Sequence, residues 1–180
     1  MKRALTTGFF LTMLLALSSS NAAWDPKGLE DDIAKGQVAT DALLENSPKM
    51  QRYFDAAAGY VVIPTVGKGG IGIGGARGKG LLYEGGEPTA EVTMSQLSIG
   101  FQWGGQAYSE FVFFEDDKAL EKFKEGNFEL GAQASAVAVT AGISVDAGYE
   151  SGVAIFTQAK GGLMYEAAVG GQKFKVKELK

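Results

Sequence analysis

The sequence predicts a mainly β protein of the α+β class, folded as a small antiparallel barrel or a strongly coiled sheet with packed N-terminal helices and one mid-chain helix. Short apolar segments separated by glycine turns fill most of the chain, which contains 26 glycines in 180 residues, and this pattern is typical of many short strands. Helical periodicity is confined to the residues before 57 and to a segment near residue 120. Glycines within strands mark sharp bends, so we expect the sheet to close or to coil.

The N-terminal residues have the pattern of an export signal, expected to span residues 1–23. Lys2 and Arg3 precede an apolar run, FFLTMLLAL, that is too short to span a bilayer, and small residues follow it. We expect cleavage after Ala22 or Ala23, with an uncleaved anchor as the alternative. The protein is therefore predicted to be exported, most simply to a bacterial periplasm, and to be peripheral to a membrane.

The remaining chain, residues 24–180, is expected to form one domain with a helical part (24–58) and a β-rich part (59–180). Its length suffices for a substantial core. Loss of Lys2 and Arg3 leaves 17 − 2 = 15 basic residues against 21 acidic ones, so the net charge falls from −4 to −6. This acidic balance argues against a nucleic-acid partner, whose binding proteins carry a basic footprint.

The helical part is expected to contain two helices that cover the sheet. Apolar spacing predicts the first over residues 29–46. Ser47 and Pro48 predict the N-cap and first position of a second, short helix. Because Trp24 precedes the first helix, a membrane-surface role is the alternative to core packing.

The β-rich part begins with the glycine-rich segment GYVVIPTVGKGGIGIGGARGKGLLY. Side chains alternate between the two faces of a strand, so an extended segment would place its glycines and isoleucines on opposite faces: Gly70, Gly72 and Gly74 on one, Ile71 and Ile73 on the other. A face without side chains permits a close approach of another backbone. Further strands are expected at Val92–Trp103, Tyr108–Phe114, within 128–147, and at Val153–Lys160, Leu163–Val169 and Lys173–Lys177.

Two charged segments in this part have structural explanations. Glu115, Asp116 and Asp117 are expected to begin a short helix ending near Glu125, because acids suit the positive end of a helix. Lysines at alternate positions of the last strand, Lys173 to Lys177, are expected to protect an exposed sheet edge. An anion-binding stripe is the alternative for these lysines.

The composition excludes most catalytic chemistry. The chain contains neither histidine nor cysteine, so it lacks the commonest general base, the commonest metal ligand and any thiolate. A zinc or copper site would have to consist of carboxylates alone, which these metals disfavour. We therefore expect a non-enzymatic protein without a metal or cofactor.

Residues from about Ala56 to Val176 resemble the SYLF domain, a lipid-binding module of exported bacterial proteins and of eukaryotic membrane-trafficking proteins. The resemblance rests on four segments that occur in the family's order: AAAGYVVIPTVGKGGIGIGGARGKGLLY, LSIGFQWGGQAYSEFVFF, DDKALEKFKEG followed by FELGAQASAVAVTAG, and IFTQAKGGLMYEAAVGG. It implies a non-catalytic domain that binds phospholipid or a membrane surface. The positions that match basic residues of the family are Lys68, Arg77, Lys79 and Lys160.

These bases are expected to face lipid headgroups, while Trp103, Phe101 or Tyr108 enters the interfacial region, which amphipathic rings favour. Two alternatives remain. The domain could be a structural or protein-interaction module of the envelope, with an envelope protein as partner. It could also hold a small apolar ligand inside the barrel, unless large side chains fill that space.

Overall fold

The computed structural model describes residues 26–71, 73–99, 106–126, 128–131, 135–140, 148–160, 167–168 and 171–179. The helices are α1 (Pro26–Asn46), the 3-10 turn η1 (Pro48–Met50), α2 (Gln51–Ala56) and α3 (Asp117–Lys124). The strands are β1 (Gly59–Ile71), β2 (Ile73–Glu84), β3 (Glu87–Ile99), β4 (Gln106–Phe114), β5 (Phe128–Glu129), β6 (Ser135–Ala138), β7 (Val153–Ala159), β8 (Ala167–Ala168) and β9 (Gln172–Glu178). The expected export signal lies outside the described residues.

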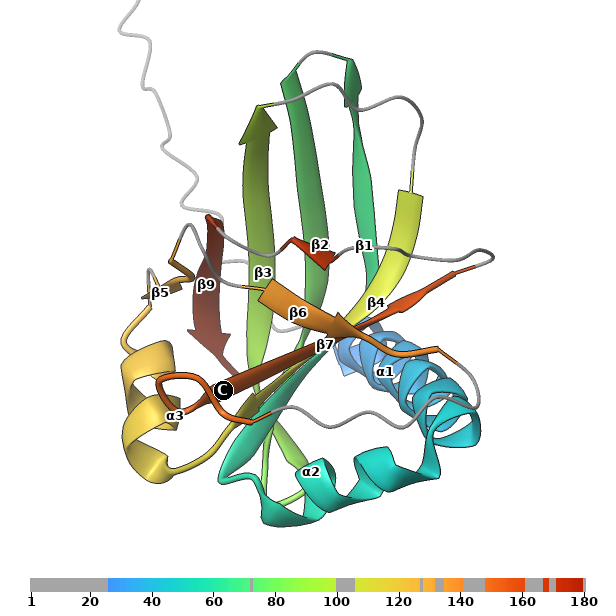
Figure 1. Ribbon diagram of the computed structural model, residues 1–180. Coiled ribbons are helices and arrows are strands. Elements are labelled where there is room, and N and C mark those ends of the chain that lie inside the picture. Colours follow the sequence, from blue (N-terminus) through green and yellow to red (C-terminus); the bar gives the residue numbers. More distant parts are fainter. Residues whose placement is uncertain are drawn as a thin grey trace, which may run out of the picture.

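The strands form one sheet in the order β5-β9-β3-β2-β1-β4-β7-β6-β8. The sheet curls into a half-barrel, with β6 and β7 crossing in front of the long strands in the view of Figure 1. The predicted class, a mainly β fold with a strongly coiled sheet, is confirmed. One pairing differs from the predicted antiparallel pattern, since β6 runs parallel to β7.

The sheet has a hydrophobic core on each side. Val61 and its alternate neighbours point to the inner, concave side, where they pack with side chains of α3 and β9. Val62 points to the outer side and packs with residues of α1, of α2 and of β7. We call these sides the inner face and the outer face. The helices therefore cover part of the outer face, as the sequence predicted.

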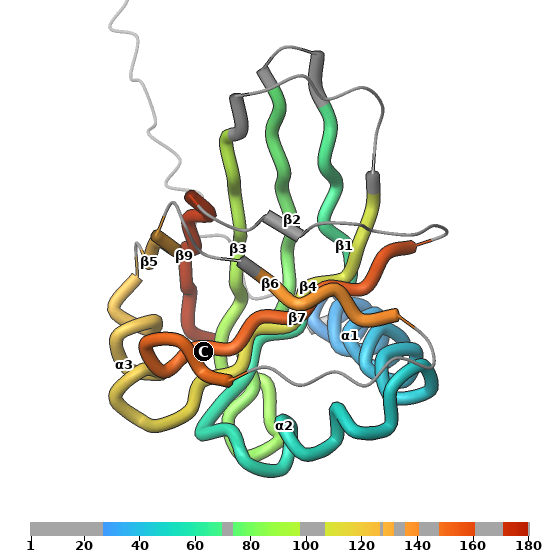
Figure 2. Tube along the Cα trace, viewed as in Figure 1, coloured from blue at the N-terminus to red at the C-terminus, as the bar shows by residue number. Residues whose placement is uncertain are grey.

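The glycine-rich segment is a hairpin, which corrects the expectation of one extended strand. Ile71 ends β1 and Ile73 begins β2, with Gly70 directly opposite Gly74. Cross-strand partners share a face, so Gly70 and Gly74 still lie on one side. Figure 2 shows the two long strands side by side, together with β9 beside β3. This last pairing joins segments far apart in the sequence.

The helical predictions hold with one exception. The first helix ends at Asn46 as expected, and η1 with α2 occupies the place of the second. Ser47 precedes the 3-10 turn, but its side chain makes no capping hydrogen bond. None of the described helices is both long and apolar enough to cross a bilayer.

The mid-chain helix α3 depends on its N-cap. The carboxylate of Asp116 accepts a hydrogen bond from the backbone N–H of Ala119 at 2.8 Å. We expect Asp116→Ala to lower the free energy of unfolding by about 1 kcal/mol, because one backbone donor of the first turn loses its partner. Asp116→Asn keeps an acceptor and should stay close to wild type in urea unfolding. Equal losses in the two variants would contradict the capping role.

Candidate functional site

Basic side chains line up across β2, β3 and β9 on the outer face. Lys79 lies opposite Thr93, which in turn lies opposite Lys175. In the adjacent row, Arg77 lies opposite Ser95 and Ser95 opposite Lys173. Because cross-strand partners share a face, cations distant in the sequence gather on one surface. We call this surface the outer basic face: Arg77, Lys79, Lys173, Lys175 and Lys177.

The alternation of burial confirms which way these side chains point. Ala76, Met94 and Phe174 are buried in the inner core, whereas the residues that alternate with them on β2, β3 and β9 are on the opposite side. All members of the outer basic face are exposed. In these rows of β2, β3 and β9, apolar groups therefore point inward and cations outward.

Two of these cations have acidic partners. Lys173 Nζ lies 3.2 Å from Glu129 Oε2, and Lys177 Nζ lies 3.6 Å from Glu91 Oε2. Both pairs are more than half exposed, so water and salt screen them strongly. Among the residues that the structure describes, no acid lies within ion-pair distance of Arg77, Lys79 or Lys175. This part of the face is accordingly electropositive.

Lys160 extends the outer face toward β7. Its backbone N–H donates to the carbonyl oxygen of Ala107 on β4, at 2.9 Å. Its side-chain Nζ donates to Thr65 Oγ1 at 2.7 Å, and Thr65 is the cross-strand partner of Lys79. Three of the bases singled out in the sequence, Arg77, Lys79 and Lys160, thus lie on one side of the sheet.

The other predicted residues lie elsewhere. Lys68 is the cross-strand partner of Ala76, so it lies on the inner face, opposite to Arg77. Trp103 and Phe101 are outside the described residues, and their membrane role stays a prediction. Tyr108 is only 4% exposed, so its expected contact with a bilayer is wrong for this conformation.

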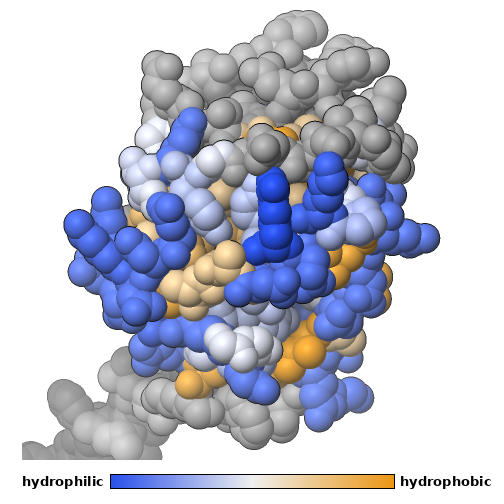
Figure 3. All heavy atoms as spheres, turned by 60° about the horizontal axis from the view of Figure 1, so that its bottom comes forward, coloured by the Kyte–Doolittle hydropathy of each residue, from blue (hydrophilic) through white to orange (hydrophobic). Residues whose placement is uncertain are grey.

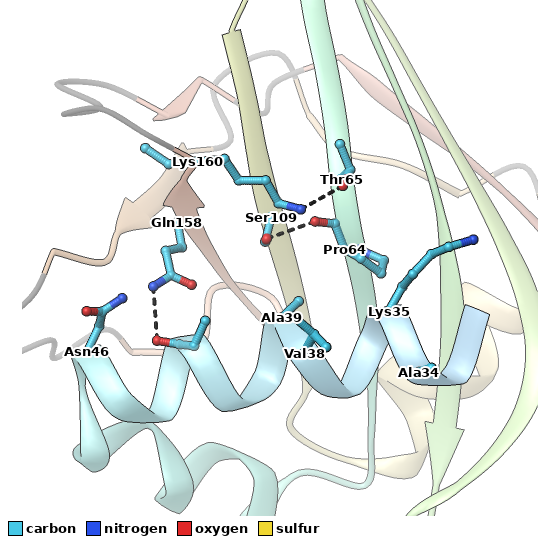
Figure 4. Close-up of a pocket in the computed structure, with 12 residues that line it drawn as sticks. Ala34, Lys35, Val38, Ala39, Asn46, Pro64, Thr65, Ser109, Gln158 and Lys160 are labelled. Carbon is cyan, nitrogen blue, oxygen red and sulfur yellow. Dashed lines mark hydrogen bonds between the residues drawn. The ribbon is translucent and has the colours of Figure 1, made fainter. Parts of the chain in front are cut away.

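A groove runs between α1 and the outer face, beside the end of the outer basic face. It encloses about 510 Å³ and is lined by α1, β1, β4, β7 and the residue after β7. Figure 4 shows α1 along one wall and the strands along the other, with Lys160 reaching across to Thr65. Its lining residues are Ala34, Lys35, Val38, Ala39, Ala42, Asn46, Pro64, Thr65, Ser109, Gln158, Ala159 and Lys160.

Hydrogen bonds hold the strand wall of the groove. Ser109 Oγ donates to the carbonyl oxygen of Pro64 at 2.9 Å, at the irregularity between Val62 and Thr65 in β1. Gln158 Nε2 donates to the carbonyl oxygen of Ala42 at 3.2 Å, which ties β7 to α1. The groove is thus built by segments that meet only in the folded chain.

Another polar group lies on the inner side. Glu110 is fully buried, and its Oε2 accepts a hydrogen bond from Gln172 Nε2 at 2.9 Å. Burial raises the pKa of Glu110 to about 7, and the bond from Gln172 lowers it to a smaller extent. No cluster of metal-ligating side chains is found among the described residues.

Part of the chain matches a known protein family. Residues 95–178 match the Ysc84 family model, described as Las17-binding protein actin regulator. The resemblance to the SYLF family is confirmed. The SYLF match begins within β3 and ends with β9, so it includes Lys160 and the β9 lysines, whereas Arg77 and Lys79 precede it.

A curated relative extends the likeness toward the N-terminus. The chain is 26% identical over 161 residues to Beta cell expansion factor A from Aeromonas veronii. The alignment covers 86% of this chain and 60% of the relative. Since the chain spans less than two thirds of that protein, the relative's name describes a longer molecule.

Local sequence patterns are ambiguous for two parts of the site. The β9 lysines alternate, a pattern that predicts edge protection, with anion binding as the alternative. Their neighbours on β3 could not be known without the register. The groove residues of α1 follow the spacing of an amphipathic helix, at Ala34, Val38 and Ala42, but that pattern equally predicts core packing.

Proposed function

We propose that the protein is an exported, non-catalytic module of the bacterial envelope that binds anionic phospholipid surfaces through its outer basic face. The observation that carries this proposal is the cross-strand alignment of Arg77, Lys79 and Lys175 without acidic partners among the described residues. The exported chain, whose net charge is −6 without Lys2 and Arg3, is repelled by an anionic surface in most orientations. Binding therefore requires one cationic face, and that face determines the orientation.

The surface supports a peripheral mode of attachment. On the face that includes the α2 end, the residues coloured in Figure 3 are mostly hydrophilic, with small separate hydrophobic patches. A base close to an anionic membrane contributes about 1 kcal/mol, and the attraction falls off within a Debye length. Attachment should accordingly be reversible and sensitive to salt.

Neutralisation of two cations tests the proposal. We expect Lys79→Gln/Lys175→Gln to weaken binding to phosphatidylglycerol-containing vesicles roughly 30-fold, because about 1 kcal/mol is lost per base. Vesicle co-sedimentation at low salt measures the effect, and purely zwitterionic vesicles should bind neither protein.

The matched control is Lys118→Gln/Lys122→Gln, which removes the same charge from exposed positions of α3. We expect it to bind like wild type. Equal weakening by both double variants would assign binding to net charge and sink the role of this face. Failure of the wild-type protein to bind either vesicle at low salt would favour the protein-interaction alternative.

A further inference from the structure

The groove beside α1 offers a ligand more apolar than polar surface. Its volume of about 510 Å³ is within the range of small-molecule sites, roughly 300–1,000 Å³. Val38 on its helix wall is 69% exposed, although isolated exposure of this kind is common. The apolar residues that line the groove are small, so they leave an open channel between its walls. They are Ala34, Val38, Ala39, Ala42, Pro64 and Ala159.

The polar atoms of the strand wall are largely engaged within the protein. Ser109 donates to Pro64, and Gln158 donates to Ala42. A sugar or nucleotide entering the groove would have to replace these bonds, because a buried polar group without a partner is costly. An alkyl chain needs no such partners. The lining therefore favours a hydrocarbon segment.

Charge locates the polar end of such a ligand. An ammonium group has three N–H donors. Lys160 uses one of them for the hydrogen bond from its Nζ to Thr65 Oγ1, at 2.7 Å. The helix wall is unsuited to an anion, since exposed Asp31 and Glu45 lie seven residues on either side of Val38, two turns away on the same helix stripe. Among the described residues of the helix wall, the one base, Lys35, already has an acidic partner, since its Nζ lies 3.2 Å from Asp32 Oδ1. An anionic group should therefore lie at the strand end, by Lys160 and Lys79.

We propose that the groove binds the alkyl chain of a single-chain anionic amphiphile, with its headgroup at Lys160. This inference deepens the proposed function and rests on its anionic-lipid chemistry. The outer basic face meets the headgroups of an intact bilayer, whereas the groove holds one chain of a monomeric lipid. The contact between Lys160 and Thr65, the partner of Lys79 on β2, makes the groove continuous with that face.

Calorimetric titration with dodecyl phosphate below its micellar concentration tests the proposal. Wild-type protein should bind it, whereas inorganic phosphate should not bind measurably and dodecyl maltoside should bind more weakly. Val38→Asp should weaken binding more than about tenfold, because it places a charge in the apolar channel. Lys160→Gln should weaken it roughly fivefold. Gln37→Glu adds a charge to the same helix at an exposed position outside the groove lining and should bind like wild type.

The two proposals separate in a paired assay. Val38→Asp should retain binding to phosphatidylglycerol vesicles, and Lys175→Gln should retain binding to dodecyl phosphate. Circular dichroism and thermal unfolding verify that each variant is folded. The inference is overturned if wild type does not bind dodecyl phosphate, if Val38→Asp binds it normally, or if dodecyl maltoside binds equally well. A concentration-dependent dimer abolished by Val38→Asp would also overturn it, by assigning the groove to a second copy of the chain.

Discussion

Gly80→Ala is expected to prevent the chain from reaching its native sheet. A Cβ atom at this position would overlap the carbonyl oxygen of Val62 and lie 2.8 Å from Cα of Ile63. Both contacts are with backbone, so no side-chain rotation can relieve them. The cause is the irregularity between Val62 and Thr65, which presses β1 against β2. The expected loss exceeds about 4 kcal/mol, a large part of the stability of an ordinary domain.

Urea unfolding followed by circular dichroism measures this effect, with Gly67→Ala as the matched control. Gly67 lies on β1 in the same hairpin, and an added Cβ would meet nothing within 4 Å. We expect the control to remain within about 1 kcal/mol of wild type and even to gain stability, because alanine restricts the unfolded chain. A native-like transition for Gly80→Ala would show that the two strands can separate without loss of the fold.

The contrast between these glycines shows what local sequence patterns could predict. Hydrophobic periodicity was enough to place most helices and strands, and Asp116 was recognisable as a helix start from its acidic context. The need for glycine at Gly80 was not recognisable, because it depends on where β1 departs from regular pairing. A glycine-rich segment reveals that close approach is possible, but the register decides which glycine is indispensable.

The same limit applies to the basic residues. Lys68, Arg77 and Lys79 are close in sequence, and the family resemblance predicts that they act together. The hairpin pairs Lys68 with Ala76 but Thr65 with Lys79, so Lys68 faces the interior side while Lys79 faces outward. Conversely, Lys175 joins Lys79 through the pairing of β9 with β3. Non-local pairing of this kind leaves no local signal.

Glu110→Gln is expected to raise the free energy of unfolding above pH 7 by about 3 kcal/mol. Glu110 is fully buried and has one hydrogen bond, from Gln172. Its other oxygen, Oε1, has no partner among the described residues, and neither has Gln172 Oε1. A neutral amide at position 110 supplies an N–H donor and avoids a buried charge, which explains the expected gain.

The raised pKa of Glu110 determines how its contribution to the free energy of unfolding changes with pH. Burial raises the pKa of Glu110 from 4.5 to about 7, so the folded protein holds its proton more tightly than the unfolded chain. The stabilising contribution of the protonated group is complete below pH 4.5 and is lost as pH rises to about 7. At 1.36 kcal/mol per pH unit, the loss totals about 3 kcal/mol. Burial, and secondarily the charge of Glu110, raises the pKa of neighbouring Tyr108 far above this window.

Chemical unfolding of wild type and Glu110→Gln between pH 4 and 8 isolates this contribution, because the other carboxylates cancel in the difference. The difference in unfolding free energy should grow between pH 4.5 and 7 and then level off. A difference that is constant with pH would mean that Glu110 carries the same protonation state throughout.

Ionisation of Glu110 is expected to affect strand β9, to which this side chain is hydrogen-bonded. Its bond to Gln172 joins β4 to β9 across the half-barrel, although β1, β2 and β3 separate these strands in the sheet. Strand β9 bears Lys175 on its outer side. Ionisation of Glu110 places an uncompensated charge behind this strand. The protection factors of the β9 amides, which correct exchange rates for their intrinsic rise with pH, should therefore fall above pH 7 in wild type but not in Glu110→Gln. Exchange that is equally slow in both proteins at pH 8 would show that β3 alone holds β9 in place.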